Sequence, residues 1–206
     1  MMVTDGLLTL PSGDRQSPTA RLSHVPGEIG IWLFVLSDML FEFSTIFGYF
    51  LYERAADPAV FARSRATLSQ SLGLVNTLLL LTSSMFVALG IRALREGNRA
   101  RTARMFVWAR SLGIAFVAVK ILEYGDKVSM GLTPVTNSFY MYYFAATGLH
   151  LLHVLIGLVV LTYIVKGART AQPRPHELRS AEVGATFWHM VDLIWIILFP
   201  LLYLVS

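Results

Sequence analysis

No cysteine occurs among the 206 residues of the sequence, and only 15% of the residues are charged. The lack of cysteine excludes disulfide bonds and metal sites with thiolate ligands, including copper centres of the mixed-valence type. The sequence also contains no glycine-rich phosphate loop and no nucleophile elbow. A motif for nucleotide-dependent or serine-hydrolase chemistry is therefore absent.

Hydrophobic residues are abundant instead, at 55% of the chain, and the mean hydropathy is +0.59. They form runs that reach the roughly 20 residues a helix needs to cross a hydrocarbon layer of about 30 Å. Because the backbone finds no water in lipid, we expect these runs to be helices. The five predicted spans are 29–52, 68–94, 105–124, 138–165 and 183–205. The sequence thus predicts an all-α, polytopic membrane protein with five transmembrane helices.

The polar segments divide the chain into a tail and a membrane domain. Residues 1–27 contain three prolines and no apolar stretch long enough for a cleaved signal peptide, so we expect a cytoplasmic N-terminal tail with little fixed structure. Residues 28–206 form the predicted five-helix transmembrane domain. Its connections are expected to be loops at 56–66, 95–104, 129–137 and 166–182, and Thr136 or Asn137 can cap the helix that follows the third loop.

Basic residues predict the orientation in the membrane. Lys and Arg in cytoplasmic loops outnumber those on the other side, so the richer side indicates the cytoplasm. Eleven lie on the side of the N-terminus and four on the other: Arg15, Arg21, Arg92, Arg95, Arg99, Arg101, Arg104, Lys166, Arg169, Arg174 and Arg179 against Arg54, Arg63, Arg65 and Lys127. We expect a cytoplasmic N-terminus, a C-terminus outside, loops that contact anionic lipid head groups, and no nucleic-acid partner.

Several predicted spans contain ionisable residues, although a charge at the bilayer centre costs about 3 kcal/mol or more. Residues three or four apart share a helix face and can interact. The candidates are Asp38 with Glu42, Lys120 with Glu123, Lys127 four residues beyond Glu123, His150 with His153, and His189 with Asp192.

One interpretation of these residues is internal pairing. Lys120 can neutralise Glu123 on its own helix, and Asp192 can accept a hydrogen bond from His189. Polar contacts between helices stabilise membrane bundles by about 0.6–2 kcal/mol each. The residues would then tie the bundle together.

A second interpretation concerns protons. Asp38 and Glu42 have no basic partner on their own helix. Desolvation and mutual repulsion both oppose double ionisation, so such a pair is expected to hold at least one proton. We therefore predict a proton-related or partner-facing role for Asp38 and Glu42.

A third interpretation is metal binding. His150 and His153 could share a metal with His189, and a carboxylate could complete the set. The chain has only five histidines, however. We expect no metal or other cofactor in this chain, apart from a structural phospholipid.

Motifs in all five spans resemble subunit III of the haem–copper terminal oxidases. The most distinctive are "ATGLHLLHVLIG" and "FWHMVDLIWIILFPLLYL"; "LSDMLFEF", "NTLLLLTSS" and "ILEY" are also similar. They occur in the family's order from about Pro26 to the C-terminus. The resemblance implies the five-helix form of the family fold, which lacks the first two helices of the long form.

The resemblance further implies a non-catalytic subunit of the bacterial inner membrane, without haem or copper, that belongs to a respiratory oxidoreductase. Such a subunit packs beside the catalytic, subunit I-like protein and other respiratory subunits, binds phospholipid between its helices, and supports proton uptake and stability during turnover. Asp38 matches the position of a membrane-buried glutamate. The positions expected to bind lipid or tie helices are Lys120, Glu123, Tyr124, His150, His153, His189 and Asp192.

Other stretches favour a particular branch of this family. "PGEIGIWLFVLSDM", "KILEY" and "TNSFYMYYF" are similar to accessory membrane proteins associated with bacterial nitric oxide reductases. The catalytic partner is thus an oxidase, or alternatively a nitric oxide reductase. An independent proton-coupled transporter and a metal-dependent membrane enzyme are hypotheses from other classes; the absence of paired discontinuous helices disfavours the transporter.

Overall fold

The computed structural model describes residues 48–170 and 176–204, together with positions 30, 33, 36, 37 and 40. Every element of secondary structure in this part of the chain is helical. The predicted tail 1–27, most of the first span, and the candidate residues Asp38 and Glu42 lie outside the described residues. The division into tail and membrane domain therefore stays a prediction.

The helices fall into two size classes. Two short helices come first: α2 (Gly48–Ala56) and α3 (Pro58–Arg65). The long ones are α4 (Gln70–Arg95), α5 (Arg99–Ser129), α6 (Ser138–Arg169) and α7 (Glu177–Phe199), which continues into the π-helical turn η2 (Pro200–Leu204). In the described residues, four helices are long and apolar enough to cross a membrane: α4, α5, α6, and α7 with η2. The last four predicted spans thus correspond to membrane-length helices, and the first is not tested.

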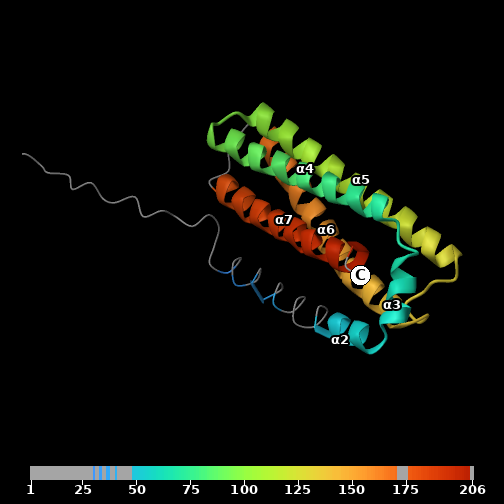
Figure 1. The fold of residues 1–206 in the computed structure, drawn as a ribbon. Coiled ribbons are helices and arrows are strands. Elements are labelled where there is room, and N and C mark those ends of the chain that lie inside the picture. Colours follow the sequence, from blue (N-terminus) through green and yellow to red (C-terminus); the bar gives the residue numbers. More distant parts are fainter. Residues whose placement is uncertain are drawn as a thin grey trace, which may run out of the picture.

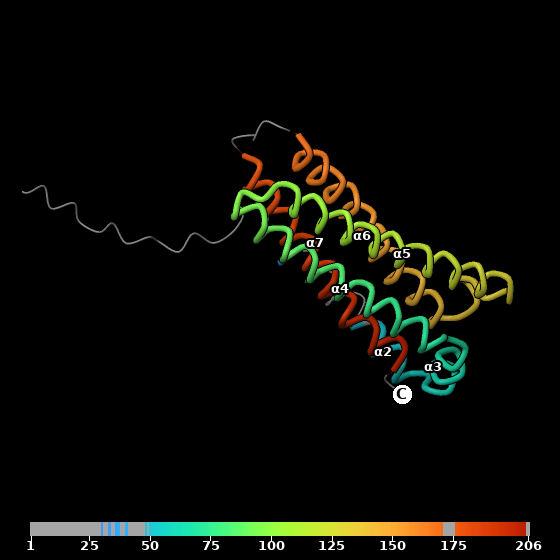
Figure 2. The backbone as a smooth tube through the Cα atoms, turned by 90° about the horizontal axis from the view of Figure 1, so that it is seen from above, coloured from blue at the N-terminus to red at the C-terminus, as the bar shows by residue number. Residues whose placement is uncertain are grey.

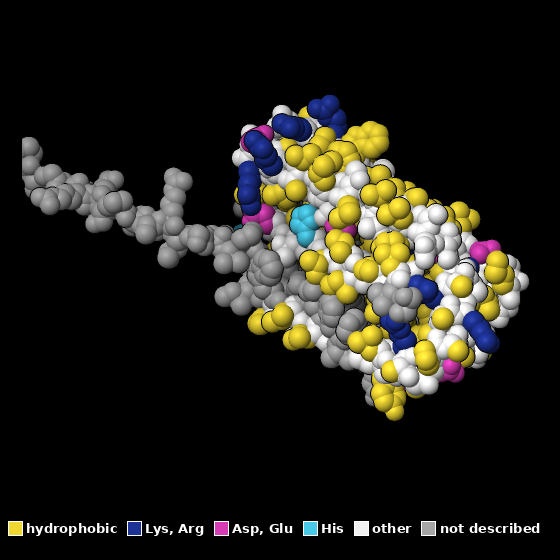
Figure 3. Space-filling view, viewed as in Figure 1, with side chains coloured by type: hydrophobic (Ala, Val, Ile, Leu, Met, Phe, Trp, Pro, Cys, Tyr) yellow, Lys and Arg dark blue, Asp and Glu magenta, His cyan; other side chains and the backbone are white. Residues whose placement is uncertain are grey.

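The four long helices form a closed ring. Helix α4 packs against α5 and α7, and α6 packs against the same two helices. The α4–α5 connection, the end of α6 and the start of α7 lie at one end of this bundle, whereas α3, the α5–α6 connection and η2 lie at the other (Figures 1 and 2). We call the first of these the basic end. Its positively charged side chains are those of Arg92, Arg95, Arg99, Arg101, Arg104, Lys166, Arg169 and Arg179. Figure 3 shows Lys and Arg side chains gathered at this end.

Large apolar side chains are common on the outer faces of the ring. Leu78 on α4, Leu122 on α5 and Val159 on α6 are 55%, 72% and 71% exposed. Apolar patches of this extent are rare on soluble monomers and are typical of a surface that contacts lipid or another subunit. Together with the membrane-length helices, they define a multi-pass membrane protein.

Two glycines allow α5, α6 and α7 to approach closely. The indole of Trp188 on α7 fits against both, because a Cβ atom on Gly113 would lie 2.8 Å from the ring and one on Gly157 would lie 2.6 Å from it. Trp188 is 1% exposed. The bulky ring therefore fills the space that the missing side chains leave between α5 and α6.

Two of the predicted connections are largely helical instead. Residues 58–65 form α3, because Asp57 accepts a hydrogen bond from the Val60 N–H and Pro58 occupies the first turn, where its missing N–H costs nothing. Helix α5 begins at Arg99, since Asn98 caps it by accepting from the Arg101 N–H. The prediction of a loop over 95–104 was therefore wrong beyond residue 98.

The other two connections agree better with expectation. Asn137, one of the two predicted caps, accepts a hydrogen bond from the Tyr140 N–H at the start of α6. Gly131, before it, has φ of +75°, a conformation that glycine adopts without strain. Helix α6 extends to Arg169 and α7 starts at Glu177, so the last connection is shorter than predicted.

Candidate functional site

Three polar side chains form a closed cluster inside the bundle. The Lys120 ammonium donates to Glu123 Oε2 at 2.9 Å and to the Tyr203 hydroxyl at 2.9 Å, and that hydroxyl donates to Glu123 Oε1 at 2.6 Å. We call Lys120, Glu123 and Tyr203 the ionic cluster; they are 1%, 2% and 0% exposed. Internal pairing of Lys120 with Glu123, one of the sequence interpretations, is therefore what the structure has.

Aromatic rings enclose the positive end of this cluster. The Lys120 Nζ lies 4.8 Å from the centroid of the Trp195 ring, 5.3 Å from Tyr143, 5.5 Å from Tyr203 and 5.7 Å from Tyr124. The negative face of an aromatic ring attracts a cation, more strongly where water is excluded. The cage thus offsets part of the cost of burying the ammonium group.

The end of the chain is held in place from the other side. Tyr203 lies in η2, and the carbonyl oxygens of this turn accept hydrogen bonds from Gln70 Nε2 (to Tyr203, 3.1 Å) and Arg65 Nη1 (to Leu204, 2.9 Å). The last carbonyls of a helix lack partners within the helix, so these two side chains satisfy them. They also fix the depth at which the Tyr203 hydroxyl meets Lys120.

Tyr124 and Lys127 of α5 make contacts of a similar kind. The Tyr124 hydroxyl lies 2.6 Å from Thr147 Oγ1 on α6. Lys127, 2% exposed, donates to the carbonyl of Thr67 at 2.7 Å and to Asp126 at 3.3 Å. Lys127 therefore binds the segment before α4, not Glu123, from which the sequence placed it four residues away.

The two histidines of α6 lie among aromatic rings. His150 is fully buried, 5.1 Å from the Trp195 ring and 5.6 Å from the Phe116 ring between centroids. Neither ring nitrogen of His150 has a hydrogen-bond partner among the described residues. His153, 6% exposed, packs its ring against Phe187 at 6.4 Å. Both histidines thus help pack α6 against its neighbours.

His189 and Asp192 lie one turn apart on α7, as predicted. His189 does not bond to Asp192 as expected, but to a residue of another helix. The His189 Nδ1 pairs with the Ser84 hydroxyl of α4. Asp192 is 6% exposed and its Oδ1 has no hydrogen-bond partner among the residues that the structure describes. The bond of His189 therefore ties α7 to α4, a helix for which the sequence offered no ionisable candidate.

The structure brings Lys120, Glu123 and Tyr124 together on one side of the core and places His189 on the α4–α7 contact. Within the described ranges, no three His, Asp or Glu side chains gather closely enough to hold a metal ion. Tyr203 and Trp195 were missed, because aromatic residues near the end of a span are typical of interface anchors. Their recurrence at i, i+4 and i+8 in Trp195, Phe199 and Tyr203 is a signal that could have placed them on one face.

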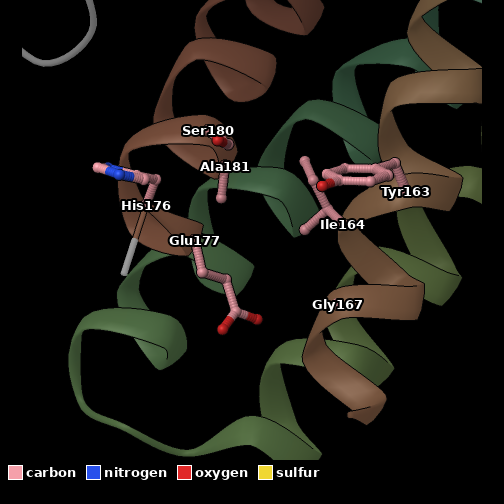
Figure 4. Close-up of a pocket in the computed structure, with 7 residues that line it drawn as sticks. All are labelled: Tyr163, Ile164, Gly167, His176, Glu177, Ser180 and Ala181. Carbon is pink, nitrogen blue, oxygen red and sulfur yellow. The ribbon is translucent and has the colours of Figure 1, made fainter. Parts of the chain in front are cut away.

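A pocket lies at the basic end, between α6 and α7. It has a volume of about 340 Å³ and is lined by Tyr163, Ile164 and Gly167 on α6 and by His176, Glu177, Ser180 and Ala181 at the start of α7 (Figure 4). The Glu177 carboxylate is already engaged, since Arg99 binds both of its oxygens at 3.0 and 3.1 Å. Arg99 also donates to the Gly167 carbonyl at 2.7 Å. One guanidinium group therefore joins the ends of α5, α6 and α7.

The bundle and its buried charges define a class, the multi-pass helical membrane proteins with an internally paired ionic core. Residues 25–206 match the protein family described as "Cytochrome c oxidase subunit III". Because this match covers most of the sequence, the chain belongs to the subunit III family of the haem–copper oxidases. The resemblance stated from the sequence motifs is confirmed.

Individual relatives show the same similarity. The "Cytochrome c oxidase subunit 3" of Synechocystis sp. is 32% identical over 178 residues, which are 85% of this chain and 74% of that protein. The "Quinol oxidase subunit 3" of Bacillus subtilis is 28% identical over 193 residues, 93% of this chain and 91% of its own length. The "Heme-copper oxidase subunit I+III" of Aeropyrum pernix is 25% identical over 181 residues, 85% of this chain and 22% of that longer protein.

Proposed function

We propose that this chain is a non-catalytic subunit III of a bacterial haem–copper terminal oxidase, located in the inner membrane. It stabilises the catalytic subunit I, supports proton uptake by that subunit, and carries bound phospholipid. The observation that carries the proposal is the family match over residues 25–206. A relative named as subunit I+III supports the choice of partner, because in that protein the two subunits share one polypeptide.

The fold suits a stabilising role. The polar groups of the ionic cluster are paired inside the chain, and apolar side chains cover the outer faces of α4, α5 and α6. Such a bundle can present a rigid apolar surface to a larger membrane subunit. Asp38 and Glu42 are the residues proposed to face the partner or to hold a proton, and Tyr124, His150, His153, His189 and Asp192 tie the helices or contact lipid.

The catalytic partner is proposed to reduce oxygen, with cytochrome c or a quinol as electron donor. The names of the relatives from Synechocystis and Bacillus subtilis favour this choice. The nitric oxide reductase branch, to which "KILEY" and "TNSFYMYYF" are similar, is the second candidate. The alternative hypothesis, that the chain is an independent proton-coupled transporter, predicts that the isolated chain takes up a substrate in liposomes.

Copurification tests the proposal. An affinity-tagged full-length chain, extracted from its own membranes in a mild detergent, is expected to retain a haem-bearing large subunit in equimolar amount. An unrelated multi-pass protein with the same tag is the control. Oxygen consumption by the purified particle identifies an oxidase, and nitric oxide consumption identifies the second branch. A stable particle that contains this chain alone, without a haem spectrum, overturns the proposal.

A further inference from the structure

Arg110 is a charged residue at membrane depth that has no partner among the residues described by the structure. It is half-buried on α5, its Nε is shielded from solvent without a hydrogen bond, and no ion pair of Arg110 occurs among residues 48–170 and 176–204. A charge at such a depth is costly unless it finds a partner or reaches the membrane surface. Arg110 therefore needs a counter-charge from outside the described chain.

The guanidinium group lines an open groove between α5 and α6. The groove has a volume of about 540 Å³; Ile114, Leu155 and Val159 form apolar walls, and Lys166 lies at the end nearer the basic end. No acidic residue is among its lining residues. The groove thus combines two positive charges with an apolar channel on the outer face of the bundle.

The directions of α5 and α6 predict that the two cations lean toward each other. A side chain on a helix points back toward the N-terminus of that helix. Helix α5 begins at the basic end and α6 ends there, where Arg99 Nη2 donates a hydrogen bond to the Gly167 carbonyl at 2.7 Å. Arg110 is therefore expected to point toward the basic end and Lys166 toward the membrane centre. Both charged groups would then meet over the stretch of groove between them.

This stretch lies at the depth of a lipid head group. Helix α5 has 31 residues, which is about 46 Å at 1.5 Å per residue. If a hydrocarbon layer of about 30 Å is centred on it, Arg110, eleven residues after Arg99, lies about 8 Å inside the boundary. An extended arginine side chain covers about that distance. Lys166 lies three residues before the end of α6 and just outside the boundary.

We propose that this groove is a binding site for an anionic phospholipid. The phosphate lies between Arg110 and Lys166, and an acyl chain follows Ile114, Leu155 and Val159 toward the membrane centre. None of the seven residues for which lipid contact was predicted from the sequence lines this groove. The site stands on the geometry of this chain, whichever catalytic subunit is its partner.

A lipid fits these observations better than an acidic residue from a partner helix. Counter-charge is needed at the boundary between hydrocarbon and head groups, where lipid phosphates lie. A carboxylate on a neighbouring helix could pair with Arg110 alone. It would leave Lys166, which also lines the groove, without a role. The apolar walls of the groove, which continue from the cations toward the membrane centre, also suit a lipid acyl chain.

Native mass spectrometry of the purified full-length chain can test the site. We expect a phosphatidylglycerol adduct that binds more tightly than phosphatidylcholine. Arg110→Gln and Lys166→Gln are each expected to weaken phosphatidylglycerol binding about fivefold, the effect of one basic residue next to an anionic lipid. Arg104→Gln is the matched control, because it removes an exposed positive charge from α5 outside the groove and should leave this binding unchanged.

A variant that keeps both charges separates the groove from general charge effects. Val159 is 71% exposed, so Val159→Trp should fold while its indole fills the channel; we expect it to weaken phosphatidylglycerol binding as well. Equal binding of the two lipids by the unaltered chain, or an equal loss in Arg104→Gln, overturns the proposal. Competition by glycerol 3-phosphate, which has no acyl chains, would assign the site to a soluble phosphate. Loss of a partner subunit from Arg110→Gln membranes, with lipid binding unchanged, would assign it to an acidic helix.

Discussion

The Lys120 ammonium lies 2.9 Å from the Glu123 carboxylate, three residues further along α5, and the two side chains are each 1% exposed. Removing two charges from water costs several kcal/mol per ion, and their attraction repays this only where further hydrogen bonds satisfy both groups. Tyr203 supplies those bonds from η2, 80 residues beyond Glu123 in the sequence. The pair therefore couples the stability of α5 to the position of η2 at the end of α7.

Replacing one member of this pair is expected to destabilise the chain strongly. Lys120→Met leaves Glu123 buried beside Tyr203 without its cation, which costs about 3–5 kcal/mol of unfolding free energy. The measurement is unfolding in mixed detergent micelles, followed by circular dichroism. The double variant Lys120→Met/Glu123→Leu removes both charges and should recover most of the loss.

An exposed ion pair on α4 provides the control for this experiment. Arg92 and Glu96 lie 3.0 Å apart with side chains 76% and 45% exposed. Pairs of this kind contribute less than about 1 kcal/mol, so Arg92→Gln should change little. A loss in Arg92→Gln as large as that in Lys120→Met would contradict the role of burial.

Tyr203→Phe removes one hydroxyl from the ionic cluster and keeps the ring. Glu123 then loses a donor and Lys120 an acceptor, and leaving buried polar groups unsatisfied costs about 1–3 kcal/mol. Thermal unfolding in detergent should show a lower midpoint for this variant. Tyr52→Phe, at a position 71% exposed, should leave the midpoint unchanged, and equal shifts in both variants would refute the assigned contact.

The sequence predicted the membrane helices better than their ends. A run of apolar residues reports the hydrocarbon thickness, so α4 and α6 begin within two residues of their predicted positions, whereas α7 begins at Glu177, six residues before its predicted span. Helix α5 starts at Arg99, six residues before its predicted span, because arginines outside the hydrocarbon layer remain compatible with helix. Asp57 and Asn98, which cap α3 and α5, were local signals for the starts of these helices, but a prediction from hydropathy alone did not use them.

The candidate site was predictable only in its local part. The i, i+3 spacing of Lys120 and Glu123 indicates a pair on one helix, and the structure contains it. Tyr203, 80 residues away from Glu123 in the sequence, enters through the packing of α7 against α4 and α6, which no local spacing encodes. The choice of Ser84 as the partner of His189 depends on the same long-range packing.

The orientation of the chain can be tested because it has no native cysteine. Val135→Cys, at a position 92% exposed in the α5–α6 connection, should react with a membrane-impermeant maleimide added to intact cells. Ala100→Cys, exposed at the basic end, should react only after the membrane is opened. The reverse pattern would contradict the assignment of the basic end to the cytoplasm, which rests on the positive-inside rule.

Asp38 and Glu42 are expected to affect proton movement in the intact complex. Asp38→Asn removes a group that can hold a proton, so proton uptake by the complex in liposomes should slow severalfold while the haem content stays unchanged. Glu53→Gln, on α2, is the matched control and should retain the original rate. An Asp38→Asn complex with unchanged uptake would leave the carboxylate with a partner-facing role alone.

Gly157 on α6 should not tolerate even one added carbon. A Cβ atom there would lie 2.6 Å from the Trp188 ring, which is itself enclosed by Gly113 and cannot move away easily. Gly157→Ala is therefore expected to lower the unfolding free energy by about 1–3 kcal/mol through overpacking. Gly125→Ala is the matched control: it lies within α5, a Cβ atom meets nothing within 4 Å, and alanine favours a helix by about 1 kcal/mol over glycine. The two alanine variants should thus shift stability in opposite directions in the same unfolding assay, and a gain in both would show that Trp188 can leave its place between α5 and α6.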